Sequence, residues 1–136
     1  MKKFIVLFLI VVLAMGVLSG TVNAADKIKI GYSCNNFNDT FQTVIEGYAK
    51  AYAEANDIDY SYTDAGEDVI KQQDQIKAFI SEGVDALVVV PVDTSAMDPV
   101  IKLAAEAKIP LVFVNRNPFA GIKTEDIPAN TYYVGS

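Results

Sequence analysis

Amide, carboxylate and guanidinium side chains gather at three points of the chain, and their types suit the binding of a small polyhydroxylated molecule. Asn38 and Asp39 form the first group, Asp93 stands in the second, and Asn115 with Arg116 forms the third. Each of these side chains can engage two adjacent groups in one plane, which is the arrangement that vicinal sugar hydroxyls present. The pattern therefore predicts a sugar-binding site.

Phe41 adds an aromatic ring close to the first polar group. Such a ring can cover the C–H face of a pyranose and remove the less polar side of the sugar from water. Each of these residues also has a purely structural alternative. Phe41 fits the apolar face of a helix, Asp39 can be only a helix cap, Asp93 a cap or turn residue, and Asn115 with Arg116 a solvated loop.

The candidate residues lie between alternating strand-like and helix-like segments. Short apolar or alternating runs predict strands, and apolar residues at helical spacing predict helices. The order and the short connections predict an α/β fold, a doubly wound parallel sheet in flavodoxin-like order with helices on both faces. The predicted strands are 28–33, 58–62, 86–90, 111–114 and 131–134; the predicted helices are 40–55, one from Val69 to a stop at Gly83, and one from Asp98 to before Ile109.

Local signals predict how the helices begin and which way they face. Asp39 and Gln42 have the spacing of a capping pair, and Asp98 is expected to cap the last helix ahead of Pro99. In the helix over 40–55, the apolar residues at helical spacing are expected to face inward. They are Phe41, Val44, Ile45, Tyr48 and Tyr52.

Two strands carry opposite signals. Residues 58–62 alternate apolar and polar side chains, which is typical of a strand at or near a sheet edge. Residues 86–90 are an unbroken apolar run, which is typical of a central parallel strand buried on both faces.

The predicted topology locates the site. In an open parallel sheet, ligands bind beyond the carboxyl ends of the strands. The three polar groups follow the first, third and fourth predicted strands, so we expect them to meet there. Other polar and aromatic residues accompany them, namely Asn35, Asn36, Asn117, Phe37 and Phe119.

The first 24 residues have the pattern of an export signal. Lys2 and Lys3 precede an apolar run too short to cross a bilayer, and Val22-Asn23-Ala24 offers a cleavage site before Ala25. Residues 25–136 then form one domain with a net charge of −8, which disfavours nucleic acid as a partner. We expect a periplasmic or extracellular protein.

Nothing in the composition favours catalysis. The chain has no histidine, no glycine-rich dinucleotide or phosphate loop and no pairing of nucleophile and base, so it is not expected to be an enzyme. Cys34 is the single cysteine, and we interpret it as a small, partly buried apolar residue. No cofactor and no metal is predicted.

At these positions the chain resembles the amino-terminal lobe of the periplasmic sugar-binding proteins that serve ABC importers, the ribose- and galactose/glucose-binding group. The matching segments run over residues 27–31, 73–76, 83–87, 91–93, 109–112 and 132–135. The resemblance implies that Asp39 binds hydroxyls, Phe41 stacks on the sugar, and Asn115 and Arg116 are ligand contacts. Val90 stands where ribose binders carry a ligand asparagine, so the resemblance favours a hexose such as galactose or glucose.

The resemblance also implies partners and a missing half. Members have a second lobe of similar size, so residues 25–136 are expected to be one lobe only, with weak affinity on its own. The implied partners are a monosaccharide and an ABC permease in the membrane. A sensory module for a sugar or autoinducer, feeding a chemoreceptor or a sensor kinase, is the alternative function.

Overall fold

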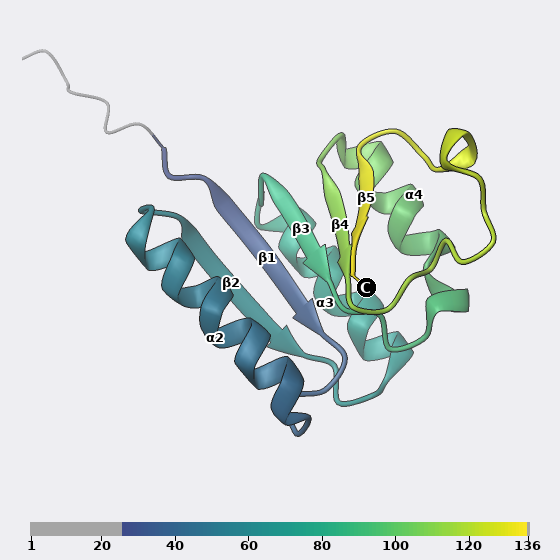
Figure 1. Ribbon diagram of the computed structural model, residues 1–136. Coiled ribbons are helices and arrows are strands. Elements are labelled where there is room, and N and C mark those ends of the chain that lie inside the picture. The colour runs from purple at the N-terminus through teal and green to yellow at the C-terminus, as the bar shows by residue number, and fades with distance from the viewer. Residues whose placement is uncertain (1–25, 136) are drawn as a thin grey trace, which may run out of the picture.

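The computed structural model describes residues 26–135, which form a five-stranded, wholly parallel sheet in the order β2-β1-β3-β4-β5 (Figure 1). The predicted export signal therefore lies outside the described residues. No helix within 26–135 is long and apolar enough to span a bilayer. The strands are β1 (Lys29–Cys34), β2 (Asp59–Asp64), β3 (Ala86–Val89), β4 (Leu111–Val114) and β5 (Thr131–Val134).

Three α-helices and two short 3₁₀ turns connect the strands. They are α2 (Thr40–Ala55), α3 (Val69–Ser81), α4 (Asp98–Ala107), η1 (Thr94–Ala96) and η2 (Thr124–Asp126). Helix α2 lies on one face of the sheet, and α3 and α4 lie on the other (Figure 1). The doubly wound α/β prediction is confirmed, and so is the edge position of the second strand.

The helix ends follow the sequence signals in part. Asp39 caps α2 by accepting a hydrogen bond from the backbone N–H of Phe41, and Gly83 has the predicted left-handed conformation with φ +75°. Gln42 does not complete a capping pair, because its buried Oε1 accepts no hydrogen bond. The expectation for Asp98 is wrong: Met97 occupies the N-cap of α4 without a side-chain bond, and Asp98 is the first helical residue.

The main apolar core lies between the sheet and helices α3 and α4. Leu87, Val89, Leu111 and Phe113 point to this face and are fully buried. The ring of Phe79 on α3 packs directly over Gly31 of β1, at a distance that leaves no room for a side chain there. This contact brings α3 close to β1, next to the edge strand β2.

Helix α2 is rotated relative to the prediction. Four of the five apolar residues expected to face inward are exposed, and only Ile45 is partly buried; the exposed residues are Phe41, Val44, Tyr48 and Tyr52. The side of α2 that meets the sheet carries Gln42, Ile45, Ala49 and Ala53 instead. Ile45, Ala49 and Ala53 line the space between α2 and the strands, whereas Phe41, Val44 and Tyr48 are exposed to solvent.

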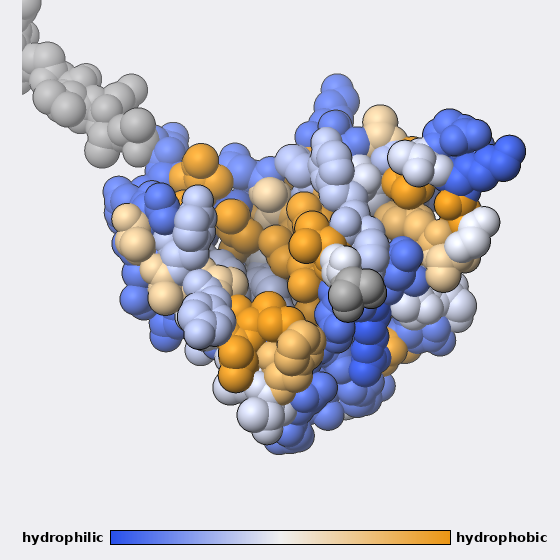
Figure 2. Space-filling view, viewed as in Figure 1, coloured by the Kyte–Doolittle hydropathy of each residue, from blue (hydrophilic) through white to orange (hydrophobic). Residues whose placement is uncertain are grey.

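The sheet face beside α2 is only partly covered. A cavity of about 230 Å³ opens between α2 and the strands, and its lining includes Tyr32, Tyr60, Val88 and Val114. Apolar side chains show across this surface in Figure 2. Val88 is partly exposed, so the prediction that the third strand is buried on both faces is only half right.

Candidate functional site

Asp39 and Asn115 lie at the same edge of the sheet, because each follows the carboxyl end of a parallel strand. Asp39 follows β1 and Asn115 follows β4, and only β3 lies between these strands. The two strands are two strand spacings apart, about 10 Å. We call this edge the carboxyl rim.

The first polar group forms the entry to α2. Asn38 is exposed, and its backbone N–H donates to Oδ1 of Asn36 at 2.8 Å. Oδ1 of Asp39 accepts from the N–H of Phe41 at 2.9 Å. Asp39 is therefore a helix cap, and this role uses one of its two carboxylate oxygens. Phe41 is 57% exposed, which contradicts the alternative that it is a core residue. Its ring remains accessible to a ligand.

The third polar group is held by an unusual backbone turn. Asn115 is left-handed, with φ 66°, and its N–H donates to the carbonyl of Val134 at 3.0 Å. Its own carbonyl accepts from the hydroxyl of Tyr133 at 3.1 Å. The strand β5 therefore fixes the exit of β4 and leaves the side chain of Asn115 exposed.

Arg116 is anchored across the rim. Nη1 donates to the carbonyl oxygens of Pro91 at 3.1 Å and Val92 at 2.9 Å, in the turn after β3. The side chain is 37% exposed. The guanidinium is thus half-buried and held in one orientation, and the alternative of a freely solvated loop side chain is wrong for Arg116.

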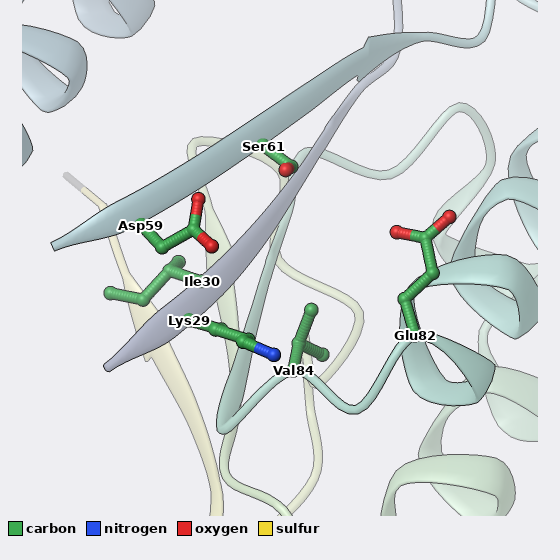
Figure 3. A pocket seen from close by; sticks show the side chains of 6 residues that line it. All are labelled: Lys29, Ile30, Asp59, Ser61, Glu82 and Val84. Carbon is green, nitrogen blue, oxygen red and sulfur yellow. The ribbon is translucent and has the colours of Figure 1, made fainter. Parts of the chain in front are cut away.

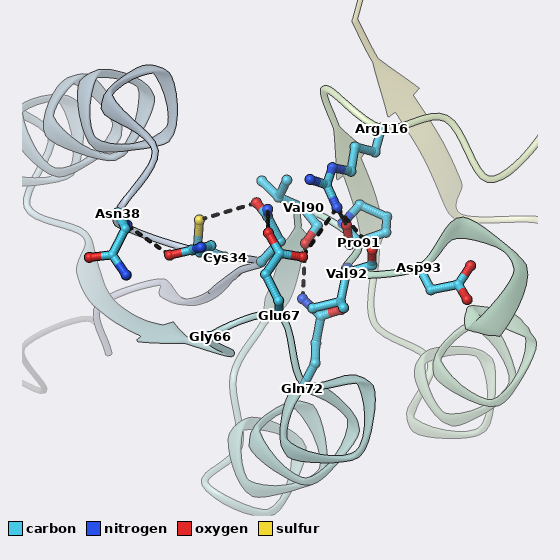
Figure 4. Close-up of polar contacts among 12 residues, drawn as sticks. Cys34, Asn38, Gly66, Glu67, Gln72, Val90, Pro91, Val92, Asp93 and Arg116 are labelled. Atoms are coloured by element: carbon cyan, nitrogen blue, oxygen red, sulfur yellow. Dashed lines mark hydrogen bonds and ion pairs between the residues drawn. The ribbon is translucent and has the colours of Figure 1, made fainter.

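Glu67 joins the rim from the turn after β2, and sequence reasoning missed it. Its Oε1 accepts from Nδ2 of Asn35 at 2.8 Å, and its Oε2 lies 3.7 Å from Nη1 of Arg116 (Figure 4). The signal was available, since the rule about carboxyl ends of parallel strands applies to the second strand as well as to the others.

Asp93 caps the short helix η1 in the turn after β3. Its Oδ1 accepts from the backbone N–H of Ser95 at 2.8 Å and from Oγ of Ser95 at 2.7 Å. These hydrogen bonds lower the pKa of the Asp93 carboxyl, because they stabilise its charged form. The carboxylate is turned toward η1 and away from Arg116 (Figure 4). The structure thus bears out its cap role and does not bring it to the other polar groups.

Three nearby side chains are withdrawn from the rim. Phe119 is buried against Phe113, with ring centroids 5.7 Å apart. Val90 is fully buried, and its carbonyl accepts from Nε2 of the buried Gln72 at 2.9 Å. Cys34 is buried as well, and burial raises the pKa of its thiol to about 11. The cysteine is therefore a packing residue, more completely buried than expected.

A polar cavity lies at the opposite end of the sheet. Its volume is about 200 Å³, and its lining includes Lys29, Asp59 and Glu82 (Figure 3). Lys29 and Asp59 begin β1 and β2, so this cavity is at the amino ends of the strands. It contains none of the predicted site residues. Within residues 26–135, no three potential metal ligands gather at one place.

The parallel α/β fold agrees with a family match. Residues 30–136 match the family described as periplasmic binding protein domain. The chain belongs to this family. A protein of Rhizobium meliloti named for rhizopine binding is 43% identical over 137 residues, which cover 100% of this chain and 41% of that protein.

Other periplasmic binding proteins extend the comparison. A xylitol-binding protein of Mycolicibacterium smegmatis is 33% identical over 110 residues, 81% of this chain and 30% of that protein. An ABC transporter solute binding protein from Bacillus halodurans, solved with bound myo-inositol, is 33% identical with a TM-score of 0.61, over 67% of this chain and 32% of that chain. Further relatives are named for galactofuranose, ribose and galactose.

Two facts follow from these comparisons. The chain spans less than half of the length of the relatives that it matches. The relatives' names describe binding proteins and not enzymes, so the chain belongs to a family of periplasmic sugar-binding proteins.

Proposed function

We propose that residues 25–136 form one lobe of an exported protein that captures a neutral monosaccharide or a related polyol. The observation that carries this proposal is the shared carboxyl rim, where Asp39, Phe41 and Asn115 are exposed beside an anchored Arg116. Carboxylate, amide and guanidinium groups bind paired hydroxyls, and the ring of Phe41 offers a stacking surface. Asn38, which is also exposed, is the remaining residue of the proposed binding site.

Within that class we propose a hexose such as galactose or glucose. Val90 supports the choice, because its side chain is buried and apolar at the position where a ribose-type site needs an amide. One relative is named for D-galactose and methyl-galactoside binding and is 31% identical over 137 residues. The relative solved with bound myo-inositol and the relative named for xylitol make cyclic and linear polyols the ligands to compare.

The proposed setting is the periplasm, reached by the signal over residues 1–24 with cleavage after Ala24. The proposed partner is the membrane permease of an ABC importer, to which the loaded protein delivers its ligand. A lobe alone covers only one side of a sugar, so its affinity is expected to be weak.

A chemical-shift titration of the purified, ¹⁵N-labelled protein tests the proposal and tolerates weak binding. Galactose, glucose, ribose, xylitol and myo-inositol are added separately. We expect shifts confined to the carboxyl rim for at least one of them, and a loss of those shifts in Asn115→Ala. The matched control is Asn56→Ala, at the far end of α2. If no ligand shifts the signals of the carboxyl rim, or if the shifts persist in Asn115→Ala, the proposed binding site is wrong.

A further inference from the structure

Glu67 occupies a backbone conformation that its residue type disfavours. Gly66 and Glu67 are both left-handed, with φ 62° and 61°. Glycine adopts this region without cost, whereas glutamate is strained there. The turn is fixed from two sides: Oδ1 of Asp64 accepts from the N–H of Gly66 at 2.8 Å, and the N–H of Glu67 donates to the carbonyl of Asn35 at 2.8 Å. Strain of this kind is often found at functional sites.

The strained turn aims the carboxylate of Glu67 at two rim residues. One oxygen accepts from Asn35, whose side chain is buried, and the other faces Arg116. The pair is partly exposed, with 45% of Glu67 and 37% of Arg116 accessible. Such an ion pair adds little to stability. The ion pair by itself therefore does not account for a glutamate in this place.

Arg116 is the single arginine of the chain, and its protein contacts leave part of the guanidinium available. Among residues 26–135, the hydrogen bonds and the ion pair of its side chain all use Nη1. The remaining N–H groups of the planar fork can donate to a ligand in a fixed direction.

We propose that Glu67 is a positioning residue for the sugar site. It holds Asn35 and Arg116 in place, and it balances the charge of Arg116 so that the rim receives uncharged ligands rather than anionic ones. This proposal rests on the proposed sugar-binding function. An arginine without a nearby carboxylate would attract carboxylates and phosphates more strongly, whereas one paired with a carboxylate donates hydrogen bonds with its own charge compensated.

The positioning role is testable without any ligand. In Glu67→Gln the acceptor for Asn35 is kept and the charge is lost; in Glu67→Ala both are lost. Because the chain has one arginine, a sample labelled with ¹⁵N-arginine gives a single Nε–H signal. We expect this signal to shift and to exchange severalfold faster with water in both variants, and the Asn35 amide signals to move only in Glu67→Ala. Glu106→Gln removes an acid from the exposed face of α4 and is the control.

The selectivity role is tested with galactose and galacturonate as a matched neutral and anionic pair. We expect Glu67→Gln to weaken galactose binding about tenfold and to shift the ratio of the two affinities toward galacturonate. An Arg116 signal in Glu67→Gln identical to that in Glu106→Gln, or an unchanged affinity ratio, would overturn the proposal. If the unsubstituted protein binds neither sugar, the proposed function fails, while the arginine signal still decides the role of Glu67.

Discussion

Nη1 of Arg116 lies 2.9 Å from the carbonyl oxygen of Val92, which ties the exit of β4 to the turn after β3. The bond crosses between neighbouring strands of the sheet. It fixes the direction of the guanidinium before any ligand arrives. A preoriented donor loses less entropy on binding than a mobile one.

Arg116→Lys is the direct test of that orientation. A lysine ammonium keeps the charge but lacks the planar fork, so it cannot hold the carbonyls of Pro91 and Val92 and also donate to a sugar in a fixed direction. We expect ligand affinity to fall at least about tenfold, as measured by chemical-shift titration. An unchanged affinity would show that charge alone matters at this position.

Two substitutions separate the cap role of Asp39 from its proposed ligand role. Asparagine caps a helix as well as aspartate does, so Asp39→Asn should leave the free energy of unfolding unchanged and still weaken sugar binding through loss of the carboxylate. Asp39→Ala should weaken binding and also cost about 1 kcal/mol of stability. Denaturant unfolding and titration measure the two effects. Full binding by Asp39→Asn would mean that the carboxylate serves only as a cap.

Glu67→Gly should separate stability from function at the turn after β2. Glycine relieves the left-handed strain, which offsets the lost contacts to Asn35 and Arg116, so the free energy of unfolding should stay within about 1 kcal/mol of the original. Sugar affinity should nevertheless fall. Urea unfolding gives the first quantity, and a large loss of stability would contradict the account of strain.

Cys34 makes the stability of the fold depend on alkaline pH. Burial raises the pKa of the folded thiol from 9.0 to about 11, so the folded state keeps its proton where the unfolded state has released it. The free energy of unfolding should therefore fall as the pH rises from 9 to 11. Between pH 8 and pH 10.5, the fall should be about 2 kcal/mol larger than in Cys34→Ala.

The comparison with Cys34→Ala is needed because other groups titrate in the same range. Burial also raises the pKa of the Tyr32 and Tyr60 hydroxyls, and both remain in the variant. Equal pH dependence of the two proteins would show that the folded thiol titrates normally.

Gly31→Ala should disrupt the contact between β1 and α3. The added Cβ would lie 2.7 Å from Cγ of Phe79, which forces the ring or the helix to move, and we expect a loss of about 1 to 3 kcal/mol. Gly47→Ala is the control, because its Cβ would meet nothing within 4 Å and alanine favours a helix interior. That variant should be slightly more stable. Equal effects of the two substitutions in thermal unfolding would contradict the packing described here.

The sequence predicts a residue of the candidate site where a polar side chain follows a predicted strand. Asp39, Asn115 and Arg116 met this condition, and they lie at one rim. Asp93 met it too, but its carboxylate is taken up by Ser95. Glu67 also follows a strand, but its contacts with Asn35 and Arg116 join residues that are remote in sequence.

The sequence alone determined the order of strands and helices, because apolar periodicity and glycine stops act over a few residues. It also determined that polar side chains follow several strands. In a parallel sheet these side chains lie at the same edge, because all strands end there. Only the tertiary structure decided which side of α2 meets the sheet, because apolar and small side chains occur on more than one side of this helix. It also decided that Glu67 reaches Arg116, since a contact between the exits of separate strands depends on the sheet order and on a left-handed turn that no local pattern specifies.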